Sequence, residues 1–280
     1  MRAILAFALA VAALAGAGAA VAQTVEFRNV AARVTIIPEP RSDVQVIVLK
    51  TNPRLPLHVD RSLGGRVVVS GGDWWSWLFG PKPSCRGDAS VYVPSVGDVA
   101  SEDLPQIAVR VPMDADVDAG GVIYGSVGRS HSLHLRAAGC GAWTVANVED
   151  RLDVVLAGAD RLHTGAARAM ALHIAGASEA TTTAVANGFT VEIAGVGDVH
   201  VGQASGPVGV HMAGGGDVRI DGGDASALDV HIAGSGSVAY GGTAGSLDAH
   251  IAGSGDIRAA KVTGAVNRFI AGSGTVIVGQ

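Results

Sequence analysis

The sequence lacks the marks of several large protein classes. Its formal net charge is −5 and lysine is sparse, which argues against a nucleic-acid partner, because that partner would need a basic surface. Neither a Gly-x-Ser-x-Gly motif nor a Gly-x-x-x-x-Gly-Lys-Ser/Thr motif occurs, so we predict no catalytic residue and no cofactor. After position 23 no apolar run of about 18 residues appears, and the mature chain is therefore predicted to contain no transmembrane span.

The first 22 residues have the order of a secretory signal peptide. One positive charge at Arg2 precedes an apolar stretch, and the small residues Ala20, Val21 and Ala22 stand directly before Gln23. An uncleaved membrane anchor is the alternative, because the apolar stretch approaches the roughly 20 residues that span a bilayer. We expect export to the periplasm, the cell surface or the extracellular space.

Cys85 and Cys140 are the two cysteines of the chain, and we predict that they form a disulfide. An even number of cysteines in an exported protein favours a bridge over metal ligation or catalysis. The bridge would tie the segment before the repeats to one of the first coils. Two unrelated buried thiols are the alternative.

Glycine and small apolar residues dominate the composition, and they recur with a fixed period. Forty glycines and 48% hydrophobic residues make the chain too apolar for a disordered linker and too rich in glycine for a helical protein. An apolar residue followed by Ala-Gly recurs in steps of 18 to 20 residues, and Gly120 and Gly139 extend the register backwards. The glycines of the full motif are Gly158, Gly176, Gly195, Gly214, Gly234, Gly253 and Gly272.

This period predicts an all-β fold, namely a parallel β-helix or solenoid of about 19-residue coils. Apolar and polar residues alternate around each motif, which is typical of strands, and a unit of this length has no room for a crossover helix. Two inward ladders are expected. One comprises Ile193, Met212, Ile232, Ile251 and Ile270, and the other Val199, Val218, Val238, Ile257 and Val276.

The chain is predicted to have three parts. Residues 1–22 form the signal peptide, residues 23–104 form an N-terminal β region, and residues 105–280 form the solenoid repeats. Proline-broken, strand-like runs in the second part indicate β structure that precedes or begins the solenoid. A cap is needed there, because an open solenoid end would pair with another chain.

Aromatic residues are concentrated in one loop, residues 73–85. Three of the four tryptophans fall within it, although aromatic residues make up only 4% of the chain. We expect this loop to contact a glycan, a partner protein or a membrane interface. The alternative is a plug folded over the solenoid and held by the disulfide. The candidate ligand-binding residues are Trp74, Trp75, Trp77 and Phe79.

Histidine recurs at one position of the repeat, directly before the apolar residue of the Ala-Gly corner. His211, His231 and His250 are therefore expected to stack about 4.8 Å apart on an outer face. Imidazoles are ligands for zinc and copper, but a straight column lacks a fourth ligand. We predict no metal site and keep these three histidines as the candidates should one exist.

Acidic residues recur at a second outward position of the repeat. Asp198, Asp217 and Asp256 are expected to be solvated corner residues that accept hydrogen bonds from turn amides, with calcium binding as the alternative. The tripeptide at 86–88, Arg-Gly-Asp, matches an integrin-binding motif that is common by chance.

The corner sequence Ala-Gly-Ser-Gly-Asp-Ile at 252–257, with variants in the neighbouring coils, resembles the auto-transporter adhesin head family, also called the GIN domain. The resemblance is strongest over residues 105–280. It implies an exported bacterial β-helix protein without established catalytic residues.

We therefore expect a non-catalytic adhesion module or cell-envelope scaffold whose partner is a glycan or a cell-envelope protein. The alternatives are a glycan-acting β-helix enzyme and a scaffold that self-associates end to end.

Overall fold

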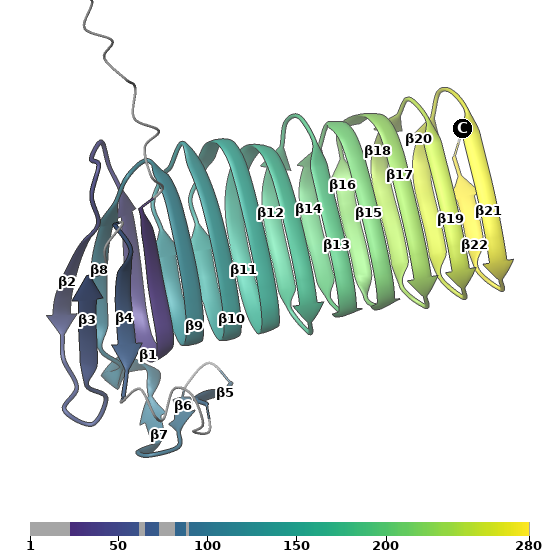
Figure 1. Ribbon diagram of the computed structural model, residues 1–280. Coiled ribbons are helices and arrows are strands. Elements are labelled where there is room, and N and C mark those ends of the chain that lie inside the picture. The colour runs from purple at the N-terminus through teal and green to yellow at the C-terminus, as the bar shows by residue number, and fades with distance from the viewer. Residues whose placement is uncertain (1–22, 62–64, 73–81, 88–89, 280) are drawn as a thin grey trace, which may run out of the picture.

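The computed structural model describes residues 23–61, 65–72, 82–87 and 90–279, and nearly all of them form strands wound into a rod (Figure 1). The rod is a parallel β-solenoid of about nine coils of about 19 residues, which confirms the predicted fold class. The predicted signal peptide lies outside the described residues. A 3₁₀ turn at Ser101–Asp103 is the only helix in these ranges. The described residues therefore contain no helix that is long and apolar enough to cross a membrane.

Long strands build the first coils. β1 (Thr24–Pro38), β9 (Asp114–Val127) and β10 (Ser132–Val145) pair in parallel, and β11 (Val148–Gly176) continues the winding. The pairing of β1 with β9 extends from Thr24 to Ile36. The first strand of the described chain therefore already belongs to the solenoid sheet.

Two ladders of shorter strands build the remaining coils, and each strand pairs in parallel with the next strand of its ladder. The first ladder continues the end of β11 with β13 (Phe189–Val196), β15 (Gly206–Gly215), β17 (Asp224–Gly234), β19 (Leu247–Gly253) and β21 (Val266–Gly272). The second contains β12 (Glu179–Val185), β14 (Asp198–Ala204), β16 (Asp217–Gly222), β18 (Ser237–Ala244), β20 (Asp256–Val262) and β22 (Thr275–Val278).

Both predicted ladders of apolar side chains form the core between these strands. Ile193, Met212, Ile232 and Ile251 are each at most 3% exposed. Ile270 in the last coil is 42% exposed, since no further described coil covers it. Each coil depends on its neighbours for burial, as in other solenoids.

Additional strands cover the N-terminal end of the rod. β4 (Val67–Gly71) and β8 (Gln106–Val111) pair in parallel with β1, while β3 (Leu57–Arg61) and β2 (Gln45–Lys50) pair antiparallel with β4 and β8. The backbone N–H and C=O groups on this edge of β1 thereby find partners within the chain.

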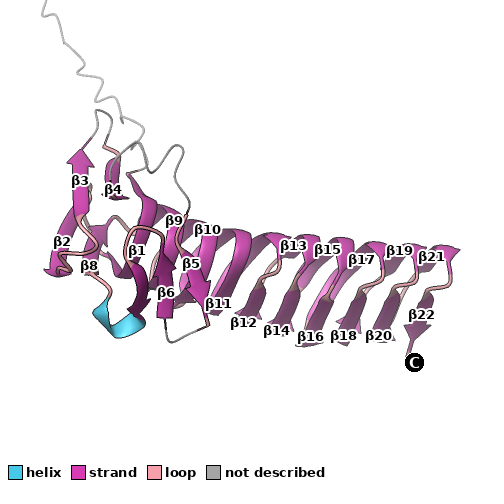
Figure 2. Ribbon diagram, turned by 90° about the horizontal axis from the view of Figure 1, so that it is seen from below, coloured by secondary structure: helices cyan, strands magenta, loops and turns pink. Residues whose placement is uncertain are grey.

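A small antiparallel sheet lies beside the rod at this end, formed by β5 (Ser84–Arg86), β6 (Ser90–Val93) and β7 (Gly97–Ala100) (Figures 1 and 2). The predicted disulfide is confirmed: Cys85 of β5 is bonded to Cys140 of β10, with Cα atoms 6.0 Å apart. A second apolar cluster joins the small sheet to the outer face of the rod. Its buried members are Ala31, Leu55, Val91, Val93, Val99, Leu104 and Val122.

Trp143 lies inside the rod and is 1% exposed. Its ring packs against Gly125 of the preceding coil, where an added Cβ would overlap with the ring. The indole therefore fits only because the facing residue has no side chain.

One carboxyl group is buried in the solenoid corner. Asp160 is 2% exposed, and its Oδ2 atom has no hydrogen-bond partner in the part of the chain that the structure describes. Desolvation raises the pKa of Asp160 from 3.8 to about 6. The position follows the corner glycine by two residues, where Gly141 and Ser178 stand in the adjacent coils.

We expect Asp160→Ser to stabilise the protein at pH 8. Because the folded-state pKa is raised, the folded chain keeps a proton that the unfolded chain releases between pH 3.8 and about 6. The contribution of Asp160 to the free energy of unfolding should therefore fall as the pH rises through this window, by about 3 kcal/mol in total. Urea unfolding from pH 4 to pH 8 measures this slope.

The variant should lose that slope, whereas Asp114→Ser, which removes an exposed carboxyl, should keep it. Parallel pH profiles for the native protein and Asp160→Ser would contradict the assignment.

Candidate binding site

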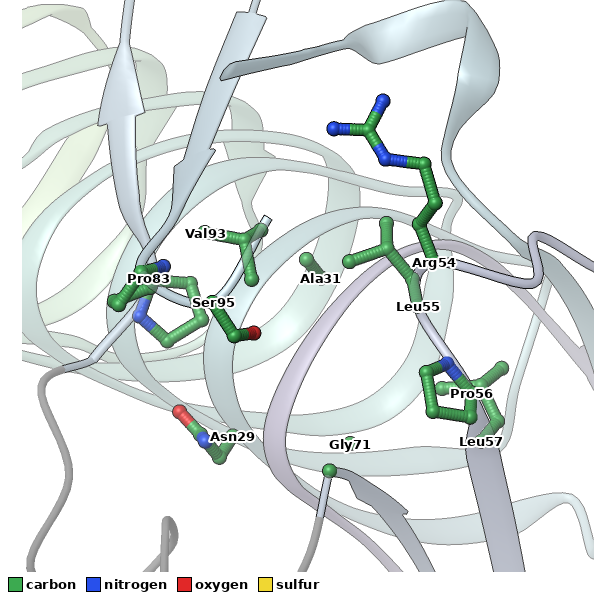
Figure 3. Close-up of a pocket in the computed structure, with 12 residues that line it drawn as sticks. Asn29, Ala31, Arg54, Leu55, Pro56, Leu57, Gly71, Pro83, Val93 and Ser95 are labelled. Atoms are coloured by element: carbon green, nitrogen blue, oxygen red, sulfur yellow. The ribbon is translucent and has the colours of Figure 1, made fainter. Parts of the chain in front are cut away.

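A hollow of about 310 Å³ lies between the N-terminal strands and the small sheet. In the view of Figure 3, Arg54 and Leu55 stand on one side of it, Val93 and Ser95 on the other, and Ala31 lies between them. Most of the lining is apolar, with a few polar groups, which is the usual character of a binding pocket. The remaining lining residues are Asn29, Pro56, Leu57, Gly71, Gly72, Pro83 and Pro94.

Asn29 supplies the unusual polar group of this hollow. The register of β1 against β9 shifts between Phe27 and Val30, and Asn29 lies in this bulge with φ = 52°. Asparagine tolerates this left-handed conformation better than most residues, and bulges commonly redirect a side chain. The Oδ1 atom of Asn29 is buried and accepts no hydrogen bond from the described residues.

Arg54 forms part of the opposite side, and its position is fixed. Its Nη2 atom donates a hydrogen bond to the carbonyl oxygen of Val96, at 2.7 Å, beyond the end of β6. The guanidinium therefore joins the N-terminal strands to the small sheet across the hollow.

A second hollow, of about 460 Å³, is lined in part by the same Asn29 and Pro83 and carries charge. Arg28 Nε donates to Glu26 Oε1 at 2.5 Å, and Arg136 donates to Asp118. These hydrogen bonds raise the pKa of both guanidinium groups. The two hollows together offer apolar walls, an unpaired acceptor and fixed ionic groups.

The predicted aromatic residues Trp74, Trp75, Trp77 and Phe79 lie outside the described residues. Residues 73–81 are flanked by Gly72, which lines the first hollow, and by Lys82, which lines the second. The role of the aromatic loop stays a prediction.

The histidine column forms as expected on an outer face. The rings of His211 and His231 stack with centroids 5.1 Å apart, and those of His231 and His250 with centroids 4.6 Å apart. Sequence reasoning missed Asp229 and Asp248, each 2.8 Å from the Nε2 atom of the histidine two residues later. The signal was present as Asp-x-His in two consecutive coils. As the described side chains stand, no group of three or more His, Cys, Asp or Glu could hold a metal ion.

The outward aspartates link neighbouring coils. Asp217 N donates to Asp198 Oδ1 at 3.1 Å, and Thr275 N donates to Asp256 Oδ1 at 3.2 Å. Asp198 and Asp256 thus accept hydrogen bonds from backbone amides of the next coil, as predicted, whereas the Asp217 carboxylate accepts one from the hydroxyl of Ser237.

Arg86 of the Arg-Gly-Asp tripeptide is engaged within its own small sheet. It donates to Asp98 at 3.2 Å and lies 4.8 Å from the centre of the Tyr92 ring. These contacts hold the guanidinium on the sheet itself.

Comparison with known proteins identifies one segment. Residues 204–279, which contain β15 to β22, match the sequence model of a family described as "Putative auto-transporter adhesin, head GIN domain". No curated protein matches the chain.

Proposed function

We propose that this chain, whose residues 204–279 match the head GIN domain family, is an exported, non-catalytic binding protein of the cell envelope. Its ligand, a glycan or an envelope protein, would occupy the hollow beside Asn29. The description of the family as an adhesin head supports a binding role, and the disulfide supports export.

The observation that carries the proposal is the buried, unpaired Oδ1 atom of Asn29 in a mostly apolar hollow. A buried acceptor without a donor is costly, and a ligand hydroxyl or amide would satisfy it. The strand that carries Asn29 and Ala31, β1, is supported by parallel pairing with β9. Trp74, Trp75, Trp77 and Phe79 would add stacking surface for sugar rings or peptide side chains.

Self-association is a second candidate, favoured by the last coil. Phe269 is 60% exposed, Ile270 42% and Ile277 52%, and β21 and β22 each pair on one edge in the described chain. A second copy could continue the pairing and cover these side chains.

A glycan and cell-envelope array, read together with assays for glycan degradation, tests the first proposal. We expect saturable binding without degradation. Asn29→Gly, which keeps the left-handed backbone and removes the acceptor, should weaken binding by about tenfold. The triple change of Trp74, Trp75 and Trp77 to alanine should weaken it further.

The control is Val196→Ala, an exposed residue far along the rod, which should bind as the native chain does. Degradation would favour the glycan-acting enzyme instead. Absence of binding, with larger species in sedimentation velocity, would favour the self-associating scaffold.

A further inference from the structure

The last coil leaves core positions uncovered at the end of the rod opposite β1 (Figure 1). β21 pairs in parallel with β19, and within the described residues its second edge has no partner. Val266 and Ile270 are in register with Leu247 and Ile251, which are at most 1% exposed. A further strand on this edge would therefore bury Val266 and Ile270 as core residues.

Arg268 stands between these two apolar residues, at a position that is apolar in the earlier coils. It is in register with the buried Ala249. The same column continues through Val230, Val210 and Val191, all of them fully buried. Because residues opposite each other on paired strands lie on the same face of a sheet, Arg268 is on the core side of β21.

The charge of Arg268 restricts which strand can cover this end. Arg268 is the one charged residue of the sequence between positions 263 and 279, and among the described residues no carboxylate forms an ion pair with it. A strand laid along β21 would bury the guanidinium, and a buried charge is costly unless it is paired. The covering strand therefore needs an acidic residue opposite Arg268 and apolar residues opposite Val266 and Ile270.

A second copy of this chain does not supply that acidic residue. Its last coil would bring another Arg268. At the other end of the rod, the edge strand β3 has Arg61 in register with the buried Val67, so a core position is again positively charged. Asp60 lies on the opposite face of β3. Like charges brought opposite each other are destabilising, and inward-pointing charges protect strand edges from pairing. The charges therefore favour a partner of different sequence.

Phe269 offers a further contact, on the outer face of the same strand. Its ring centroid lies 5.9 Å from that of His250, so it continues the column of stacked rings, and the side chain is 60% exposed. An aromatic residue beside the acidic residue of the incoming strand would stack on Phe269.

We propose that the free edge of β21 binds an extended segment of a partner protein by strand addition. The segment has an acidic residue with an apolar residue two positions before it and another two positions after it. Backbone hydrogen bonds to the edge supply affinity, and the alternate side chains supply specificity. The pattern reads the same in both directions, so it applies to parallel and to antiparallel addition.

Fluorescence anisotropy of the full chain with a labelled peptide, Gly-Ser-Val-Tyr-Glu-Tyr-Val-Ser-Gly, tests this site. We expect saturable binding that weakens about tenfold when the peptide glutamate is replaced by glutamine, because the contact loses its charge. Arg268→Glu should reverse the preference and bind a peptide with lysine in place of glutamate. The control is Arg129→Glu, which reverses an exposed charge between β9 and β10 and should change the affinity less than about twofold.

Hydrogen exchange locates the bound peptide, which should protect amides of β21 and leave those of β2 and β3 unchanged. Binding of the lysine peptide by Arg268→Glu also shows that this variant is folded. The proposal is overturned if the glutamate peptide does not bind, if the glutamine peptide binds equally well, or if Arg268→Glu keeps the native preference.

Sedimentation velocity of the native chain without peptide distinguishes the other occupant of this edge. We expect a monomer. Larger species that grow with protein concentration, together with protection of β21 amides, would identify a second copy as the occupant and would also overturn the proposal.

Discussion

Gly234→Ala is expected to destabilise the protein by roughly 4 kcal/mol, combining backbone strain with overpacking. Gly234 has φ = 143°, and an added Cβ would overlap with the carbonyl oxygen of Gly214 in the previous coil. The backbone fixes the position of the Cβ, and the carbonyl oxygen is itself a backbone atom, so no side-chain rotation relieves the overlap. The two coils must separate at this corner, and the loss is measured as a lower urea midpoint by circular dichroism.

Gly222→Ala is the matched control for this prediction. Gly222 is not in the left-handed region of φ, and nothing stands within 4 Å of the Cβ that the substitution would add. Its substitution should leave the urea midpoint almost unchanged. Equal midpoints for the two variants would show that the close approach of the corner glycines does not restrict these positions to glycine.

Replacing both Cys85 and Cys140 with serine is expected to cost about 4 kcal/mol. The bridge closes a loop of 55 residues, and removing it restores that conformational freedom to the unfolded chain. The effect should be concentrated at the N-terminal end, where the small sheet meets the rod. Limited proteolysis should therefore cut first between β4 and β8, while the later coils remain protected, because coils interact only with their neighbours.

Reduction provides the control for the disulfide. The native protein treated with dithiothreitol should match the double serine variant, and the variant itself should not respond to the reagent. If the double variant keeps the native urea midpoint and protease resistance, the second apolar cluster alone holds the small sheet in place.

Much of the fold could be predicted because the repeat carries its own register. Once the glycine steps are aligned, Ile193 falls beside Met212, and His231 beside His250, and the structure places them so. The disulfide pairing followed from there being two cysteines. These features needed only local alternation and a constant period.

The candidate site was largely hidden because it depends on residues that occur once. Asn29 is set by a bulge against a strand more than 80 residues away in sequence, and Arg54 by a carbonyl at Val96. No local pattern specifies such contacts, since they depend on how the N-terminal strands and the small sheet fold back. Asp160 was missed for a related reason: it departs from the glycine or serine of its column, and the alternation alone did not show that it points inward.

The hydrogen bonds between coils run along the axis of the rod, and this orientation has a mechanical consequence. A tensile load along the rod, applied to the last coil, would pull the hydrogen bonds between coils apart one after another. The coil would therefore peel off and would not shear. Each released coil of about 19 residues would lengthen the chain by about 60 Å while leaving the next coil intact. Under load, the protein would yield in steps and absorb work gradually, while the disulfide-linked end kept its shape.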